Sequence, residues 1–508
     1  MKRRRWLLLF IPLVALLALL PLWLSARQTD DLPRSTPAAE GISTQAVINL
    51  MDSLLMMPGC DIHHVMVVRH GKVVAEMHAA PFRAEDSHTL YSVSKLFTAL
   101  AVGIAIDENR LRLDHRVLTF FFDKMPDVIS PLMADMTVRD LLMMSSGITP
   151  DVTIRSRSTD WARDWLAQPC DEAPGTAFHY DSMCSFMLSA IVQRVTGRSL
   201  LEYLQEKLFT PMHINQAEWE KSPDGICTGG WGLRVQTEAL AKLGVLILNK
   251  GEWDGQQLVS ADYVEQACSP LIGAESESSD GGGFSYGYHL WNTSWQGLGK
   301  LSMAMGKYGQ TIAMLPDQDM VVVVLGVMVD DRGVLSFLKN QLLPGVIGGA
   351  AKGEKQLQQQ LDSLCANAMI YLPQGEPKGK PVDRKRLEMM PNSSGLAWAM
   401  LNSDTLLLAR DGQQVEVFPM GYREWHYGQL KGLPPYSIDA ANRMRDLNHD
   451  FVTASAYAWT SPAMLEVRTH YVNWIASSTY VFDFNKSELT FRDDFPGNQP
   501  YKIHFTVK

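Results

Sequence analysis

The sequence is poor in cysteine and has no excess of basic residues. Only 6 of its 508 residues are cysteine, and 37 glycines and 26 prolines are ordinary numbers, so disulfide scaffolds, collagen-like chains and low-complexity chains are excluded. The 46 lysines and arginines are outnumbered by 55 acidic residues, which argues against a nucleic-acid partner. With 46% hydrophobic residues, the chain can bury a large core and has the length of about three ordinary domains.

Several widespread functional motifs are also missing. The sequence has no GxSxG elbow, no HExxH zinc motif, no P-loop and no GxGxxG after a strand, and its cysteines show no CxxC or other metal-binding spacing. We therefore expect no metal and no cofactor. The cysteines are interpreted mainly as buried apolar residues, although the sequence leaves room for one disulfide.

Residues 1–27 differ from the rest of the chain. Four basic residues at positions 2–5 precede an uncharged apolar run of 19 residues, Trp6–Leu24, which is close to the roughly 20 that cross a bilayer as a helix. We predict a single-pass anchor in the cell membrane, or alternatively an export signal cleaved near Ser25. The positive-inside rule then places the rest of the chain on the extracytoplasmic, periplasmic side.

Residues 28–350 alternate between strand and helix patterns. His64–Glu76 predicts a hairpin around a His-Gly turn, Leu90–Arg110 predicts a helix with Ser92 in its opening turn, and Met320–Met328 predicts a buried strand. Further segments expected are helices at Val138–Met144, Ser182–Thr196, Leu200–Leu208 and Glu238–Leu248, and strands at Lys300–Met305 and Thr311–Leu315. Strands at both ends with helices between them predict an α/β layered (α+β) domain with a mainly antiparallel sheet.

The last third of the chain has a different texture. Residues 351–389 contain a polar helical stretch, Lys355–Met369, and a linker-like segment, Gly375–Lys380. From residue 390 to residue 508 the chain is a succession of short alternating segments bounded by Asp, Asn, Gly and Pro. This pattern predicts a small all-β domain, either a barrel or a sandwich.

The strongest chemical signal is an S-x-x-K motif, Ser92 to Lys95, at the start of the predicted helix. Side chains three residues apart share one face of a helix, so the Lys95 amine can reach the Ser92 hydroxyl. A serine is a weak nucleophile unless a base takes its proton, and a lysine can do so only if its pKa is lowered. A second S-x-x-K, Ser336 to Lys339, lacks companion motifs downstream and is interpreted as an ordinary pair on a helix face.

Two further motifs follow Ser92 in order. Pro174–Ser182 (PGTAFHYDS) leads into the helix that ends near Gly197, and Met305–Gln310 (MGKYGQ) joins two predicted strands. With these motifs, the stretch from about Gly41 to Ile347 resembles the serine hydrolases related to class C β-lactamases and penicillin-binding proteins. Within that family it is most similar to the branch of carboxylesterases and 6-aminohexanoate-dimer hydrolases.

The resemblance implies an enzyme that cleaves a small ester or amide through an acyl-enzyme on Ser92, with Lys95 and Tyr180 as proton-transfer partners. It also implies an oxyanion hole formed by the backbone N–H groups of Ser92 and Lys307. The substrate-binding positions that it implies are Ser182, Gly306 and Gly309.

The sequence departs from the family pattern at two places. The family's Tyr-x-Asn is Tyr180-Asp181-Ser182 here, and its Lys-Thr-Gly is Ala304-Met305-Gly306, so a cation that meets a substrate carboxylate is missing. Both changes point away from penicillin binding, and we expect esterase activity well above any cephalosporin hydrolysis. Lys307 lies three residues beyond Ala304 and is the other cation that could reach the same space.

Other conspicuous residues receive ordinary structural interpretations. His179, His213 and His289 are expected to be structural, because an S-x-x-K site needs no histidine, and Asp181 is expected to be a turn residue. The alternative function is a catalytically weak penicillin-binding-like or cell-wall-associated binding protein, in which the β domain does the important work.

Overall fold

The computed structural model describes residues 31–508, except 276–282, 330–332, 350–352, 380–383, 411, 413 and 441–450. The predicted membrane segment, residues 1–27, lies outside the described residues. Among the helices of the described part, none is long and apolar enough to cross a membrane.

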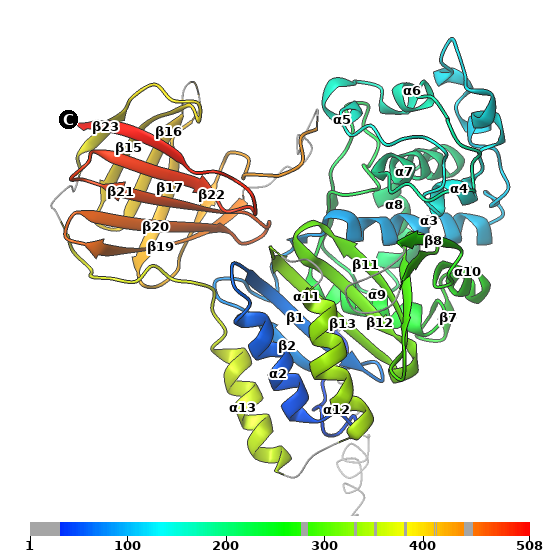
Figure 1. Cartoon of the computed structure of the whole chain (residues 1–508), viewed down its shortest axis with the longest axis horizontal. Coiled ribbons are helices and arrows are strands. Elements are labelled where there is room, and N and C mark those ends of the chain that lie inside the picture. Colours follow the sequence, from blue (N-terminus) through cyan, green and yellow to red (C-terminus); the bar gives the residue numbers. More distant parts are fainter. Residues whose placement is uncertain are drawn as a thin grey trace, which may run out of the picture.

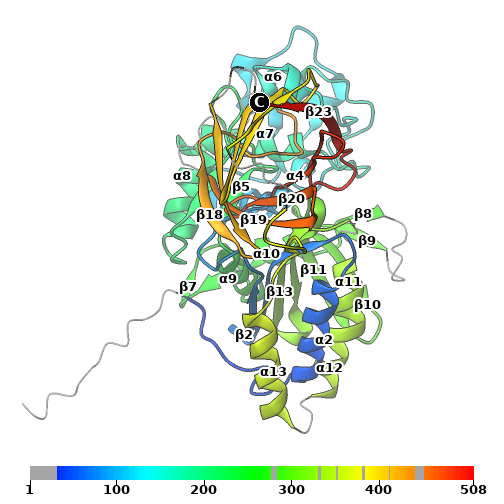
Figure 2. The same cartoon turned by 90° about the vertical axis from the view of Figure 1, so that its left-hand side faces the viewer.

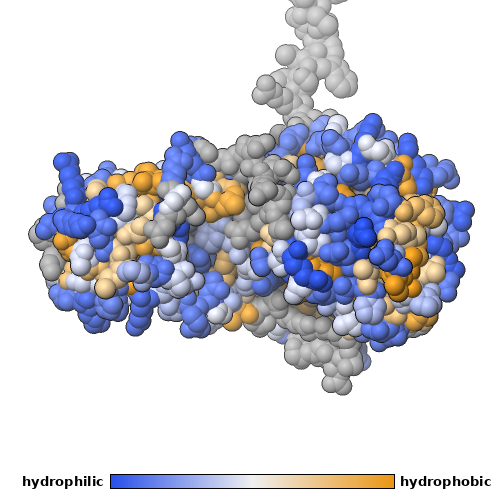
Figure 3. Space-filling model, turned by 90° about the horizontal axis from the view of Figure 1, so that it is seen from above, coloured by the Kyte–Doolittle hydropathy of each residue, from blue (hydrophilic) through white to orange (hydrophobic). Residues whose placement is uncertain are grey.

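A mixed α/β domain comes first in the chain, and a β-barrel follows it (Figure 1). The predicted α+β class with an all-β domain after it is confirmed. Seen from above, the two domains lie side by side, and the described surface of each is mostly hydrophilic with scattered apolar residues (Figure 3).

The centre of the first domain is an eight-stranded antiparallel sheet. Its strands, in spatial order, are β2 (Lys72–His78), β1 (Asp61–Arg69), β13 (Met320–Val327), β12 (Gln310–Leu315), β11 (Gly299–Gly306), β10 (Trp291–Trp295), β9 (Phe284–Tyr286) and β8 (Ile272–Glu275). The turn between β1 and β2 is the predicted His70-Gly71 pair, and both residues have positive φ, as a tight hairpin turn requires. Every residue of β13 is buried, because helices cover the sheet on both faces.

Alternation along the strands divides the core between the two faces of the sheet. Val322 and Val324 of β13 pack on one face against four helices: α2 (Thr44–Leu55), α11 (Gly333–Phe337), α12 (Leu343–Gly348) and α13 (Glu354–Ala366). Val321 and Val323 pack on the other face, against α9 (Thr237–Leu248) and a helical lobe. Figures 1 and 2 show the first group of helices stacked along one side of the sheet.

The helical lobe contains the segments that carry the serine motif. Its helices are α3 (Ser94–Asp107), α4 (Val138–Leu142), α5 (Ile154–Arg157), α6 (Trp161–Leu166), α7 (Ser182–Thr196) and α8 (Leu200–Leu204), and α10 (Ala261–Ala267) lies beside it. Helix α7 has the predicted bounds. The helix predicted from Leu90 begins only at Ser94, after a 3₁₀ turn over Tyr91–Val93, and every residue from Ser94 to Ala105 is buried.

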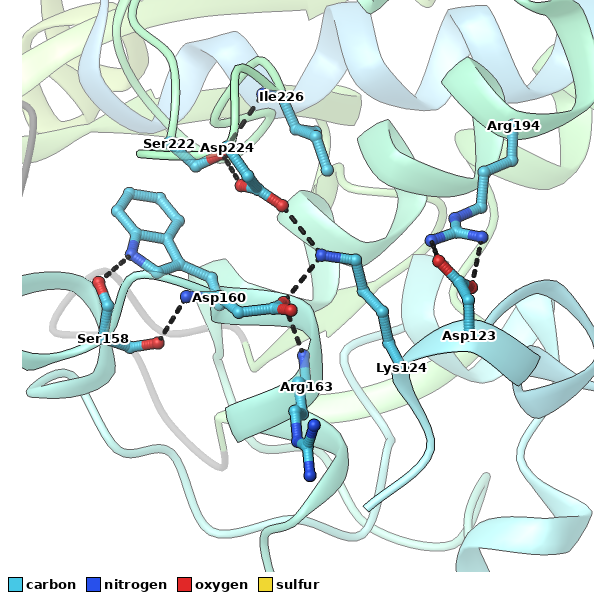
Figure 4. Close-up of polar contacts among 10 residues, drawn as sticks. Asp123, Lys124, Ser158, Asp160, Arg163, Arg194, Ser222, Asp224 and Ile226 are labelled. Carbon is cyan, nitrogen blue, oxygen red and sulfur yellow. Dashed lines mark hydrogen bonds and ion pairs between the residues drawn. The ribbon is translucent and has the colours of Figure 1, made fainter.

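Ion pairs join the outer loops of this lobe (Figure 4). The amine of Lys124 donates to Asp160 Oδ1 at 2.8 Å and to Asp224 Oδ2 at 3.0 Å, and Asp160 also caps the N-terminus of α6. The neighbouring Asp123 accepts two hydrogen bonds from Arg194 in the last turn of α7. Loops far apart in the sequence are therefore fixed around α7, which carries part of the candidate site.

Two small sheets complete the first domain. One consists of β3 (His88–Thr89), β5 (Leu233–Val235) and β4 (Ala217–Trp219), and the other of β6 (Glu252–Trp253) and β7 (Gln256–Gln257). The predicted segment 351–389 contains α13, which packs on α2 through Leu361. Of the cysteines, Cys170, Cys184 and Cys227 are buried thiols.

The second domain is a barrel whose first strand begins at Arg386, slightly before the predicted boundary at residue 390. Its strands are β14 (Arg386–Met389), β15 (Leu396–Asn402), β16 (Thr405–Arg410), β17 (Glu416–Tyr422), β18 (His426–Leu430), β19 (Phe451–Ser461), β20 (Met464–Tyr471), β21 (Ser477–Asp483), β22 (Glu488–Asp493) and β23 (Tyr501–Val507). Antiparallel pairs join the strands, and a parallel pairing of β17 with β19 closes the ring, so the domain is a barrel and not a sandwich.

Histidines gather where the barrel meets the first domain: His63 and His64 on β1, His78 on β2, His88 on β3 and His470 on β20. The rings of His63 and His88 share a hydrogen bond of 2.9 Å, and those of His64 and His78 share one of 2.7 Å. Burial lowers the pKa of His88 to about 3 and holds the pKa values of His63, His64 and His470 well below 6.5. These four rings are therefore neutral at pH 7.

We expect the protein to lose stability as the pH falls below about 6.5. The unfolded histidines bind protons near that pH while the folded ones do not, so each contributes up to about 1.4 kcal/mol of destabilisation per pH unit. Thermal unfolding between about pH 7.5 and 5.5 should show the decline. A His63→Gln/His470→Gln double variant should show a flatter slope. A wild-type Tm that does not change over this range would contradict the prediction.

Candidate active site

Ser92 lies in a tight turn at the start of α3. The preceding residue, Tyr91, is buried and has a left-handed φ of 46°, which is unfavourable for a residue with a Cβ. The N–H of Leu90 is fixed by the carbonyl of Leu233 at 3.0 Å. The turn leaves the Ser92 side chain partly exposed, although its neighbours Tyr91 and Val93 are buried.

The Lys95 amine lies directly beside this hydroxyl. It donates to Ser92 Oγ at 2.9 Å, to Ser182 Oγ at 3.0 Å and to the Gly230 carbonyl at 2.8 Å. Burial lowers the pKa of Lys95 to about 7, and nearby Asp181 opposes this shift only in part. Near pH 7 a large fraction of Lys95 is therefore neutral, with a lone pair that can accept the Ser92 proton.

Tyr180 is the third member of the group. Its ring centroid lies 4.8 Å from Lys95 Nζ, and the Ser92 side chain lies close enough to its hydroxyl to act on the pKa of Tyr180. Burial raises the pKa of Tyr180 to about 12. At neutral pH the Tyr180 hydroxyl therefore carries its proton. Its protonation state and its position beside Lys95 suit the role of a proton donor.

Ser182 and Asp181 begin α7 but have different partners. The Ser182 hydroxyl accepts from Lys95, whereas the buried Asp181 carboxylate caps the helix by accepting from the Met183 N–H at 2.9 Å and from Trp165 Nε1 at 3.0 Å. Asp181 is thus a helix cap. Ser92, Lys95, Tyr180 and Ser182, which we call the serine–lysine cluster, come together from two segments far apart in the sequence.

The end of β11 faces Ser92. A Cβ at Gly306 would lie 2.5 Å from the Leu90 carbonyl oxygen and 3.1 Å from Ser92 N, so only glycine allows this approach. Lys307 follows directly, and its Nζ lies 4.9 Å from the Tyr308 ring centroid. Gly309 has φ of 85°, and the three atoms nearest to a Cβ at this position all belong to Met328.

Two residues that support the site were not predicted from the sequence. Gly230 supplies the carbonyl that Lys95 contacts, and a Cβ there would lie 2.7 Å from the Ser182 carbonyl oxygen. Gln310 is fully buried and donates from Nε2 to the carbonyls of Lys307 at 3.1 Å and Gly326 at 2.7 Å, which holds the turn after β11. The Gly229-Gly230 pair was a usable signal for the first residue, whereas a buried strand glutamine gives none.

The second S-x-x-K has a different geometry. Asn340 Nδ2 donates to Ser336 Oγ at 3.1 Å, and Lys339 Nζ lies 5.9 Å from the Trp295 ring centroid. The two motif side chains thus contact other residues, as expected of an ordinary helix-face pair.

The surroundings of the cluster are aromatic and contain no metal-ligand set. Tyr180 stacks on Trp291 at 5.8 Å, and Phe178 and Tyr286 contact the same indole. His289 is buried, and burial lowers its pKa to about 3. Within the described ranges, no three His, Cys, Asp or Glu side chains are placed to hold a metal ion.

We expect Gly230→Ala to damage the site and the fold together. The new methyl would press on the start of α7, which costs about 1–3 kcal/mol in a packed core and moves Ser182 relative to Lys95. The Tm should fall. Gly273→Ala is the matched control, because nothing lies within 4 Å of a Cβ there. Equal Tm values for the two variants would contradict the close packing at Gly230.

Comparisons with known proteins identify the family of the chain. The family model described as Beta-lactamase matches residues 59–326. The 6-aminohexanoate-dimer hydrolase of Paenarthrobacter ureafaciens is 28% identical over 287 residues, which cover 51% of this chain and 71% of that protein. Penicillin-binding protein 4 of Amycolatopsis lactamdurans is 31% identical over 134 residues, 25% of this chain and 34% of its own.

Among solved structures, EstCE1, a hydrolase with promiscuous acyltransferase activity, has a TM-score of 0.50 at 16% identity. The match covers 58% of this chain and 98% of EstCE1, and at this identity it shows only that the fold is shared. The resemblance predicted from the motifs is confirmed by the family match, which spans more than half of the chain. The chain therefore belongs to the beta-lactamase family.

Proposed function

We propose that the protein is a serine hydrolase that cleaves a small ester or amide through a covalent acyl-enzyme on Ser92. The observation that carries the proposal is the buried Lys95 amine, 2.9 Å from Ser92 Oγ, with its pKa lowered to about 7. A neutral amine at this distance is the base that a serine nucleophile requires.

The proposed reaction has two halves, acylation of Ser92 and hydrolysis of the acyl-enzyme, and the serine–lysine cluster takes part in both. Neutral Lys95 accepts the Ser92 proton while Oγ attacks the substrate carbonyl, and the N–H groups of Ser92 and Lys307 stabilise the oxyanion. Protonated Tyr180 donates its proton to the leaving alcohol or amine while the bond between that group and the carbonyl carbon breaks. Its proton is replaced from Lys95. Water then attacks the acyl-enzyme with the proton transfers reversed, which releases the acid and restores Ser92.

The substrate is proposed to be neutral at the end that faces β11. Ala304 is buried and uncharged where the family's motif has lysine, and the Lys307 amine lies over the Tyr308 ring instead. A carboxylate without a partner there would be costly, whereas a neutral ester or amide would not. The aromatic side chains around Tyr180 suit an apolar acyl or alkyl group. The relative named 6-aminohexanoate-dimer hydrolase supports hydrolysis as the class of reaction.

A penicillin-binding-like or cell-wall-associated protein with weak catalysis is the second candidate. The match to penicillin-binding protein 4 favours it. The uncharged Ala304 and the hydroxyl of Ser182 in place of an amide argue against it.

Covalent labelling tests the proposal. We expect a fluorescent fluorophosphonate to label the wild type and a fluorescent penicillin to label it much more slowly, because a penicillin brings a carboxylate. Ser92→Ala should abolish labelling with its Tm retained, and Ser336→Ala should label like the wild type. Labelling that persists in Ser92→Ala would refute the nucleophile, and faster labelling by penicillin would favour the second candidate.

The pH dependence of ester hydrolysis tests the proton-transfer roles. Because Lys95 must be neutral to act as the base, kcat/KM should rise with pH and level off above a pKa of about 7. Lys95→Ala and Tyr180→Phe should each lower kcat about 100-fold or more. Lys339→Ala is the matched control and should leave the profile unchanged. Turnover of Tyr180→Phe at the wild-type rate would remove the tyrosine from the mechanism.

A further inference from the structure

A segment of the barrel domain contacts the turn that presents Ser92. Residues 433–440 follow β18 and run from the barrel toward the helical lobe (Figure 1). Within this segment, Ser437 Oγ shares a hydrogen bond of 2.9 Å with the hydroxyl of Tyr91, the residue directly before Ser92. The rings of Tyr436 and Tyr91 lie 5.4 Å apart.

The barrel holds this segment in place. The Tyr436 ring lies 4.9 Å from that of Trp474, and Trp474 Nε1 donates to the Pro435 carbonyl at 3.2 Å. Trp474 also contacts Arg234 of β5, whose guanidinium carbon lies 5.2 Å from the centre of the indole and which donates to the Asn473 carbonyl. The contacts to Tyr91 are thus backed by a buried junction between the two domains.

A second barrel residue contacts the turn after β11. Tyr308, directly after Lys307, stacks on Phe495 with ring centroids 5.2 Å apart and an interplanar angle of 23°. The rings of Tyr308 and Tyr91 also contact each other at 5.7 Å. Both tyrosines belong to the apolar cluster of the barrel and not to either core of the first domain, although both lie in the first domain's chain.

The backbone at these two tyrosines needs such support. Tyr91 has φ of 46° and Tyr308 has φ of 63°, and left-handed residues with a Cβ persist only where the surrounding structure fixes them. The peptide between Tyr91 and Ser92 carries one proposed oxyanion N–H, and Lys307, which carries the other, is bonded to Tyr308. A small rotation at either tyrosine would move a donor away from the developing oxyanion.

We propose that the barrel is a positioning part of the active site, in which Ser437 and Phe495 fix the two oxyanion donors through Tyr91 and Tyr308. The inference rests on the proposed function and adds a role for the second domain. Ser437 and Phe495 are positioning residues, because they act through the two tyrosines and do not touch the reacting atoms.

The test compares matched variants of the full chain. Ser437→Ala removes the bond to Tyr91, and Phe495→Leu removes the stack on Tyr308. Tyr427→Phe removes a different contact between the domains, the bond to the Pro81 carbonyl, and Phe505→Leu removes a barrel ring that packs on Phe482 and Phe484. The readouts are kcat and KM for an aryl butyrate, the rate of fluorophosphonate labelling, and the Tm.

We expect Ser437→Ala and Phe495→Leu to lower kcat and the labelling rate about tenfold or more, since loss of a whole donor costs about 100-fold or more. KM should stay within about threefold, because the oxyanion donors act mainly in the transition state. The two controls should keep the wild-type kcat. Ser437→Thr, which retains a hydroxyl, should also have a kcat close to that of the wild type. Should Phe495→Leu fail to fold, Ser437→Ala and Tyr91→Phe, which each lack only a hydroxyl, decide the question.

The failures are distinguishable. A wild type that neither labels nor hydrolyses esters overturns the proposed function and this inference with it. An active wild type whose Ser437→Ala and Phe495→Leu variants are as fast as the controls overturns this inference alone. Equal losses in all four variants would also overturn it, because they would indicate only a loosened contact between the domains.

Discussion

The arrangement of the site depends on the hydrogen bonds of the buried Lys95 amine. Its three acceptors come from the start of α3, the start of α7 and the Gly229-Gly230 segment, so one nitrogen joins three separate parts of the chain. A buried amine that lacks hydrogen-bond partners is unfavourable whether it is neutral or charged. The close packing at Gly230 and the cap on α7 therefore serve the same end, since both fix an acceptor of Lys95.

Local patterns were enough to predict much of the fold. The hairpin around His70-Gly71, the bounds of α7 and the buried strand β13 follow from turn residues and apolar periodicity. The end of α8 could not be predicted in this way. The helix was expected to continue to Leu208, but it changes at Gln205 to a π turn. The 3₁₀ turn at Tyr91 was also missed, since its geometry depends on contacts with β5 and the barrel rather than on neighbouring residues.

The candidate site likewise contains residues that the sequence predicted and residues that it did not. Spacing placed Ser92 beside Lys95, and the order of the motifs placed Tyr180 and Ser182 next to them. Gln310 and the aromatic contacts of Tyr308 could not be foreseen, because they join segments whose proximity only the folded chain reveals. The residues proposed to carry the chemistry left a pattern in the sequence, and the residues that hold them in place did not.

The order of the barrel strands has a consequence for the newly made protein. The first barrel strand, β14, pairs with β23 as well as with β15, so the ring of strands closes only once residues 501–507 are in place. During synthesis the first domain emerges well before that point and can fold as a unit. With the proposed role of Ser437 and Phe495, its two oxyanion donors would stay loosely placed until translation has passed the barrel, which would delay hydrolysis until the chain has folded throughout.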